Sequence, residues 1–187
     1  MMNLQISLET DEAALIDLCR KDIRHFEPLY IHYYKPIYRF VANRIASMDD
    51  VSDITSQTFV KAMSNIGKYK AKGYAFSAWL YRIASNEVTD YYRRNSRRYF
   101  VNIEDSGIEK LKEEGISEID TAEGRTLLTN ALNRLVADEI QLIQLRYFDD
   151  LSYAEIAAVL NMTENNARVK IFRTIKRLQT IYNNEIQ

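Results

Sequence analysis

Apolar residues recur at the three- and four-residue spacing of an amphipathic helix along most of this 187-residue chain. The spacing predicts helices over residues 11–24, 26–45, 49–66, 75–95, 127–135, 140–147, 152–160 and 163–180. Neither Asn-Gly nor Asp-Gly, the dipeptides typical of tight β-hairpins, occurs anywhere in the chain. The pattern therefore predicts an all-α fold.

Local signals indicate where some of these helices begin, bend or end. Pro36 interrupts the second helical pattern, and we expect a kink or a helix boundary there. We expect Asp49 or Asp50 to cap the next helix, because a carboxylate can accept a hydrogen bond from a free N–H of the first turn. Residues 68–74 have no helical period and are flanked or interrupted by glycine, which predicts a loop.

An acidic stretch separates the two halves of the chain. Residues 101–123 contain two glycines, no aromatic residue and many more acidic than basic side chains. Such a composition predicts a linker that does not contribute to a hydrophobic core. We therefore expect an N-terminal helical bundle over residues 1–98, a linker over 99–123 and a C-terminal four-helix domain over 124–187.

Composition excludes several classes of protein. Hydrophobic residues make up 47% of the chain, enough for proper cores, while 5 Gly and 2 Pro favour long helices over a β-sandwich or barrel. The net charge of −1 means that any binding of nucleic acid must come from local basic patches. Cys19 stands alone, which excludes a disulfide framework. No stretch approaches about 20 apolar residues and no signal peptide is evident, so we expect a cytoplasmic location.

The pattern from Ser152 to Leu178 predicts a helix-turn-helix. Ser152 and Glu155 form a capping box at the start of a short helix. The small Ala157 suits the crossing of two helices, Asn161 stands in a turn that requires positive φ, and Thr163 can cap the second helix. That second helix carries Arg168, Lys170, Arg173, Lys176 and Arg177 against one acid. Its basic face predicts contact with phosphates and base edges in the major groove of DNA.

Two further surfaces in the N-terminal bundle are candidates for function. Asp50, Asp53, Gln57 and Lys61 share one face of helix 49–66, and taken by itself this pattern favours an ordinary solvated stripe over a binding surface. Trp79, Arg82 and Asn86 share a face of helix 75–95 opposite its apolar stripe, beside loop 68–74. Aromatic, guanidinium and amide groups together suit unstacked bases, although packing explains aromatic residues in a small bundle just as well.

These residues together resemble the bacterial RNA polymerase sigma factors of the extracytoplasmic-function type. Asp53-Ile54-Thr55-Ser56-Gln57-Thr58-Phe59 resembles one helix of the family's region 2, and the Trp79-Leu80-Tyr81-Arg82-Ile83-Ala84 string resembles the next. The segment Leu145–Ala157, followed by Arg168–Arg173, resembles region 4. The likeness covers roughly residues 22–95 and 125–180, in the family's order and with a linker between.

The resemblance implies a promoter-specificity subunit that binds core RNA polymerase, recognises the −35 and −10 promoter elements and promotes melting of the DNA. It assigns the duplex −35 element to Asn166, Arg168, Val169, Lys170, Phe172 and Arg173. It assigns the opened −10 element to Tyr74, Phe76, Trp79, Arg82, Asn86 and Arg93. It assigns core polymerase binding to Asp50, Asp53, Gln57 and Lys61.

The implied partners are the clamp helices of the largest polymerase subunit, the polymerase flap, and promoter DNA both as duplex and as melted strands. An anti-sigma protein that holds the two domains inactive is also implied. The acidic linker is expected to lie in the RNA exit channel, where its carboxylates can mimic RNA phosphates.

The two alternative functions are a stand-alone helix-turn-helix regulator and an enzyme. A stand-alone helix-turn-helix regulator would bind its DNA site without polymerase, usually as a dimer. An enzyme finds little support, because His25 and His32 lack a carboxylate or cysteine cluster at ligand spacing, and no phosphate-binding loop or nucleophile motif occurs. We therefore expect a protein that is not an enzyme and holds neither a metal nor a cofactor.

Overall fold

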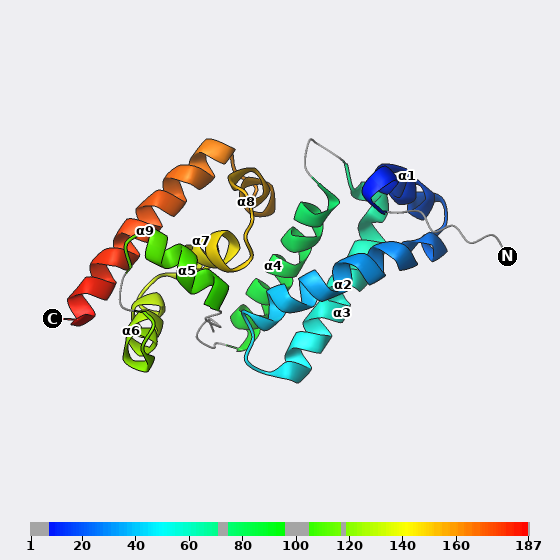
Figure 1. Cartoon of the computed structure of the whole chain (residues 1–187). Coiled ribbons are helices and arrows are strands. Elements are labelled where there is room, and N and C mark those ends of the chain that lie inside the picture. The colour runs from blue at the N-terminus through cyan, green and yellow to red at the C-terminus, as the bar shows by residue number, and fades with distance from the viewer. Residues whose placement is uncertain (1–7, 71–74, 96–104, 117–118, 187) are drawn as a thin grey trace.

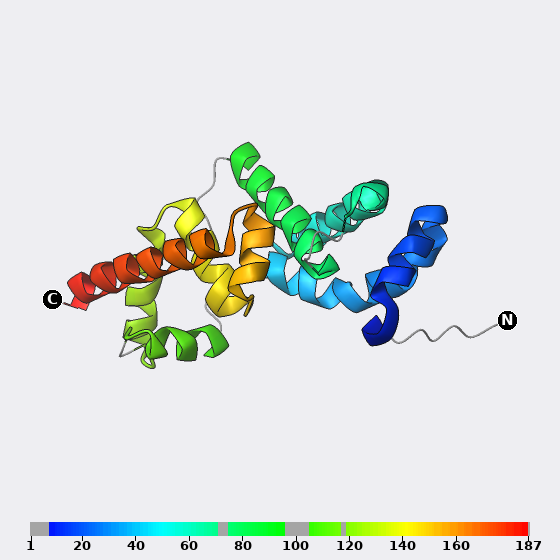
Figure 2. The same ribbon diagram turned by 90° about the horizontal axis from the view of Figure 1, so that it is seen from above.

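The computed structural model describes residues 8–70, 75–95, 105–116 and 119–186, and in these ranges it contains helices and no strands. The all-α prediction is confirmed. The helices form two groups that lie side by side, with the N-terminus and the C-terminus at opposite ends of the molecule (Figures 1 and 2). Helix α4 of the first group packs against α8 of the second.

The first group contains α1 (Leu8–Lys21), α2 (Glu27–Ala42), α3 (Met48–Asn65) and α4 (Phe76–Asn95), with short 3-10 turns η1 (Ile23–Phe26) and η2 (Ile66–Lys68). Their apolar stripes form a common core, in which Leu29, Phe40, Phe59, Phe76 and Leu80 are fully buried. Burying each such side chain stabilises the bundle by about 1.5–3 kcal/mol. The stripes are those that the helical spacing predicts.

The structure excludes one of the two alternatives expected at Pro36 and contradicts the expected cap of α3. Helix α2 continues through Pro36, so the proline does not mark a boundary. Pro36 is exposed, and water can therefore hydrate the carbonyl group that the missing N–H leaves without a helical partner. The cap of α3 is Ser47 rather than Asp49 or Asp50, because the Ser47 side chain accepts from the N–H of Asp50.

The described part of the predicted linker is folded and packs on the rest of the protein. Residues Asp105–Glu113 form helix α5, and the side chains of Ile108, Leu111, Ile116 and Ile119 are at most 1% exposed. The prediction that this stretch adds nothing to a core is therefore wrong. Apolar residues recur at helical spacing among the acidic residues of this stretch and form one apolar face of the helix. This face packs on the C-terminal helices.

The second group contains α6 (Ala122–Asn133), α7 (Ala137–Ile143), the π-helical turn η3 (Gln144–Phe148), α8 (Tyr153–Leu160) and α9 (Glu164–Ile186). Helix α9 lies along α6, α7 and α8, and it buries Ala167, Ile171, Ile175 and Leu178 against them. Gly107 of α5 lies directly on the ring of Phe148 at the end of η3. The linker helix is therefore part of the packed C-terminal group.

Candidate nucleic-acid interface

The turn between α8 and α9 has the local chemistry that the sequence predicts. The Ser152 hydroxyl accepts from the Glu155 N–H at 3.2 Å, and the Glu155 carboxylate accepts from the Ser152 N–H at 2.8 Å. Asn161 ends α8 with φ 54° and ψ 50°, the left-handed conformation that asparagine tolerates better than most residues. Thr163 caps α9 through the N–H of Asn166 at 3.3 Å. The predicted helix-turn-helix is confirmed.

Helix α9 has a buried side and an outer side. Every residue predicted to contact duplex DNA lies on the outer side and is exposed: Asn166, Arg168, Val169, Lys170, Phe172 and Arg173. Phe172 is 61% exposed, which is unusual for so large an apolar side chain on a face of charged groups. The six side chains therefore form one continuous surface that is open to a partner.

Arg168 is held in place on this surface. Its guanidinium donates to the Glu164 carboxylate at 3.1 Å and lies 4.4 Å from the centre of the Tyr153 ring. Arg146 lies over the same ring at 4.9 Å. The negative quadrupole of the Tyr153 ring attracts both guanidinium groups, and this attraction helps to hold Arg168 in position.

A second surface lies between α3 and α4. Trp79, Arg82 and Asn86 of α4 line an open hollow of ≈ 540 Å³, together with Lys61 and Asn65 from α3 and with neighbouring polar residues. The Trp79 ring contacts those of Tyr69 and Phe76, with centroids 5.3 and 5.4 Å apart. These contacts fix the indole at the edge of the hollow and leave it partly exposed.

Not every residue predicted for the −10 element joins this hollow. Phe76 is fully buried between Tyr33, Tyr69 and Trp79, so it supports the indole and has no free face for a base. Arg93 is exposed near the end of α4, where it pairs with Asp90 at 2.9 Å, and it does not line the hollow. Tyr74 lies outside the described residues.

A third surface runs along the neighbouring face of α3. Asp50, Asp53, Gln57 and Lys61 line a hollow of ≈ 660 Å³ together with residues from α4. Asp53 and Gln57 are exposed, whereas Asp50 accepts a hydrogen bond of 2.8 Å from the Tyr91 hydroxyl. The structure thus brings all four predicted residues together.

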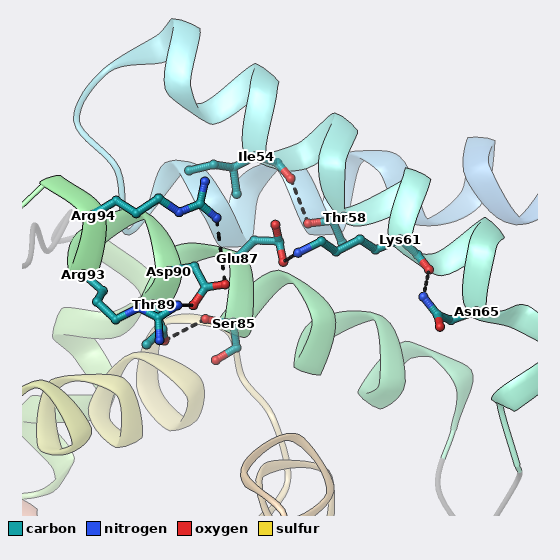
Figure 3. A network of polar contacts seen from close by, with 10 residues as sticks. All are labelled: Ile54, Thr58, Lys61, Asn65, Ser85, Glu87, Thr89, Asp90, Arg93 and Arg94. Atoms are coloured by element: carbon teal, nitrogen blue, oxygen red, sulfur yellow. Dashed lines mark hydrogen bonds and ion pairs between the residues drawn. The ribbon is translucent and has the colours of Figure 1, made fainter.

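Glu87 is a residue of this region that the sequence analysis missed. Its carboxylate is only 9% exposed and pairs with the Lys61 ammonium across the α3–α4 boundary (Figure 3). Lys61 and Glu87 line both the hollow of Trp79 and that of Asp53. The sequence did contain a sign of this role, because Glu87 is an acidic residue between the apolar positions Ala84 and Val88 of one helix. A carboxylate on the buried side of a helix requires a cationic partner.

Family comparisons agree with this arrangement. Residues 29–98 match the family model of Sigma-70 region 2, and residues 125–178 match that of Sigma-70, region 4, so the two cover about two thirds of the chain. The chain belongs to the extracytoplasmic-function (ECF) sigma factors. Its function is therefore that of a promoter-specificity subunit of RNA polymerase, and region 2 of that family lies in the N-terminal group and region 4 in the C-terminal group.

Relatives of this ECF sigma factor are similar over most of its length. It is 27% identical over 178 residues to the ECF RNA polymerase sigma factor BldN of Streptomyces coelicolor, a match that spans 91% of the chain and 66% of BldN. The ECF sigma factor SigM of Bacillus subtilis is 27% identical over 84% of the chain and 94% of SigM. The solved structure of CnrH in complex with the cytosolic domain of CnrY has a TM-score of 0.62 at 21% identity, covering 91% and 96% of the two chains. It shows the same fold.

In the described ranges, no helix of the sigma factor is both long and apolar enough to cross a membrane. The same ranges hold no group of three or more His, Cys, Asp or Glu residues arranged to bind a metal ion.

Proposed function

We propose that this sigma factor holds a promoter at two places, with α9 on the duplex −35 element and the hollow of Trp79 on the opened −10 element. The observation that carries the proposal is the outer face of α9. Six residues of the types that contact phosphates and base edges are exposed together on one helix whose other side is buried.

The outer face of α9 offers several kinds of contact with a major groove. Arg168, Lys170 and Arg173 can neutralise phosphates or donate to guanine, and Asn166 can pair with adenine. Exposed Phe172 suits the methyl group of thymine, an apolar contact that a charged face alone could not provide.

The hollow of Trp79 suits a base that has left the DNA stack. Stacking on an aromatic ring contributes about 1–3 kcal/mol per base, which offsets much of the few kcal/mol that unstacking requires. Arg82 and Asn86 line the same hollow and can donate to or accept from the edge of the base. Arg93, further along α4, is exposed, and we propose that it contacts a phosphate of the same strand.

Core polymerase is proposed to bind the hollow of Asp53. Asp53 and Gln57 lie one helical turn apart on the exposed face of α3 and form a polar edge for the clamp helices of the largest subunit. The flap of the polymerase is the proposed partner of region 4. In this role the sigma factor positions and opens DNA and has no reaction of its own, and it acts in the cytoplasm.

The test uses purified core polymerase and separates polymerase binding from promoter opening. We expect Asn86→Ala or Arg82→Ala to reduce open complexes at least tenfold with unchanged polymerase affinity, and Asn133→Ala on α6 to change neither. Asp53→Arg should weaken the complex with polymerase, whereas Asp138→Arg, an equal charge change on α7, should not. Equal loss of polymerase binding and opening in the Asn86 variant would contradict the assignment.

Recognition of the −35 element has its own matched pair of variants. Replacing Arg173 by Ala should weaken discrimination of this element by about 1–3 kcal/mol if its guanidinium reads a base. Arg177→Ala is the control, because Arg177 lies one turn further along α9 but pairs with Glu139 of α7 at 2.9 Å. Identical promoter preference in both variants would exclude a reading role for Arg173.

The alternative is a stand-alone helix-turn-helix regulator. It requires tight, site-specific binding to duplex DNA without polymerase, which a gel-shift assay with and without core polymerase measures. The family match does not favour this alternative.

We also propose an anti-sigma protein as a regulatory partner. RpoE of Bartonella quintana, solved in complex with the anti-sigma factor NepR, has a TM-score of 0.56 and 19% identity to this chain, over 83% of it and 95% of RpoE. Co-purification from the native cell, followed by inhibition of transcription with the captured protein, tests this partner.

A further inference from the structure

Helix α1 contacts the residues that support the hollow of Trp79. It packs against η2, and the Arg20 guanidinium of α1 donates to the Tyr69 carbonyl, just after η2, at 2.5 Å. The two residues lie 49 positions apart in the sequence. Tyr69 is only 6% exposed, and a buried carbonyl group requires a hydrogen-bond donor. Arg20 therefore supplies a donor from another helix at the point where the chain leaves η2.

Arg20 is itself oriented by its own helix. Its other terminal nitrogen pairs with the Asp17 carboxylate, one turn earlier on α1, at 2.5 Å. The N–H groups of a guanidinium lie in a rigid planar fork, so a contact at one prong also directs the other. The Arg20 side chain is 35% exposed, at the edge of the bundle, and a substitution there leaves the core side chains in place.

The Tyr69 ring connects α1 to the hollow of Trp79. The rings of Tyr69, Phe76 and Trp79 contact one another in all three pairs, with centroids 5.3 to 5.4 Å apart. Tyr69 meets Phe76 edge to face, with the two ring planes at 90°. Such pairs hold their rings at a defined distance and angle. A displacement of Tyr69 would therefore remove one of the two rings that hold the indole.

A second polar contact joins α1 to these rings. The Tyr33 hydroxyl donates to the Glu12 carboxylate of α1, and the Tyr33 ring contacts that of Phe76 with centroids 5.6 Å apart. Burial, and secondarily the Glu12 carboxylate, raises the pKa of Tyr69, which agrees with a place for this acid near both tyrosines. Helix α1 thus contacts the supports of the indole at two points, through Arg20 and through Glu12.

We propose that α1 is a positioning element of the −10 site, in which Arg20 sets the place of the Trp79 indole by holding Tyr69. The inference rests on the −10 function proposed above for the hollow of Trp79. Stacking of a base requires an aromatic face at a fixed place. Neither Arg20 nor Tyr69 lines that hollow, so both act on a captured base through the indole.

The first test observes the indole in the free chain. The chain contains one tryptophan, so tryptophan fluorescence reports on Trp79 alone. Arg20→Ala should increase quenching of this fluorescence by acrylamide about twofold, because Tyr69 then opens locally and uncovers the ring. Energy transfer from tyrosine to Trp79 should fall. Arg20→Lys keeps the charge and a donor, and both values should return at least halfway to those of the wild type.

Arg24→Ala is the matched control for this change. It removes the same charge from the neighbouring turn η1, where Arg24 pairs with Asp22 at 2.6 Å and is 87% exposed. Quenching and energy transfer should stay at the wild-type values in this variant. Wild-type fluorescence of Arg20→Ala, with its fold intact by circular dichroism, overturns the proposal.

The second test measures promoter opening. Core polymerase carries each variant on a promoter that the wild-type protein selects from a random DNA library, and permanganate reactivity of thymines reports open complexes. A hydrogen bond from a charged group, weakened by solvent at the partly exposed Arg20, changes an equilibrium by about three- to tenfold. We expect Arg20→Ala to reduce open complexes by this factor with unchanged polymerase affinity. Arg24→Ala should change neither.

A double-variant cycle separates positioning from a general loss of stability. If Arg20 acts through the indole, Arg20→Ala should cause no further loss of open complexes in the Trp79→Ala background. Additive losses would overturn the proposal, because Arg20 would then act without Trp79. Wild-type opening by Trp79→Ala would instead refute the proposed −10 function, and the fluorescence of Arg20→Ala would still decide whether α1 holds the indole.

Discussion

The linker helix offers a direct test of its packing at Gly107. A Cβ atom added at this position would lie 2.3 and 2.4 Å from two carbon atoms of the Phe148 ring. Carbon atoms normally approach to about 3.5–4.0 Å, so the overlap exceeds about 1 Å. Phe148 is 4% exposed, and its ring cannot swing into solvent to make room. Gly107→Ala should therefore push α5 away from region 4.

The expected magnitude follows from two opposing effects. Overpacking a buried contact costs about 1–3 kcal/mol. Replacing glycine by alanine inside a helix returns about 1 kcal/mol through helix propensity. The net loss of stability is up to about 2 kcal/mol, equivalent to a fall in Tm of up to about 8 °C for a chain of this size.

Thermal unfolding and amide hydrogen exchange measure the two parts of this prediction. The Gly107→Ala variant should melt at a lower temperature and exchange faster over residues 105–116, while α2 and α3 keep their protection. Gly67→Ala is the control, because a Cβ added in η2 meets nothing within 4 Å. Its stability should change by less than about 0.5 kcal/mol. A Gly107→Ala variant that is as stable as Gly67→Ala and also keeps wild-type exchange over residues 105–116 would refute the packing of α5 on Phe148.

Three other changes follow from local geometry. Ser152→Ala should cost about 1 kcal/mol in urea unfolding, because it removes the cap of α8; an unchanged midpoint would contradict this. Asn161→Gly should be neutral or slightly stabilising and Asn161→Ala destabilising by about 1 kcal/mol, since the residue has φ 54°; the reverse order would exclude the left-handed turn. Burial, and secondarily Asp149, raises the pKa of Tyr81 to about 12 from about 10. Between these values the unfolded chain loses a proton that the folded chain keeps, so stability falls as pH rises from about 10 to 12, and Tyr81→Phe should flatten this part of the curve.

Local chemistry determined the helix-turn-helix. The capping box of Ser152 and Glu155, the left-handed Asn161 and the Thr163 cap all join residues within three or four positions of one another. Such contacts form wherever the helix forms, so the residue types and their spacing predict them. The outer face of α9 followed for the same reason, because its buried and exposed sides repeat with the helical period.

Tertiary structure determined which side chains are buried where the local sequence pattern does not indicate burial. The sequence predicts that Phe76 contacts the −10 element, but packing with Tyr33 and Tyr69 buries its ring. Ile108 and Leu111 lie in an acidic stretch, and their side chains are buried in the structure, in which α5 packs on η3. In each case the burial depends on a surface that the local sequence does not contain.

The ion pair between Arg44 and Asp149, which connects the two groups of helices, depends most clearly on tertiary structure. The sequence places Arg44 on an otherwise apolar stripe, and such a charge requires a partner. It does not say which carboxylate, because Asp149 lies 105 positions away and the pairing depends on how α4 meets α8. The sequence by itself therefore determined the helices, their caps and the exposed reading face. Only the tertiary structure decided that the two promoter-binding regions face each other, because long-range contacts depend on how whole helices pack.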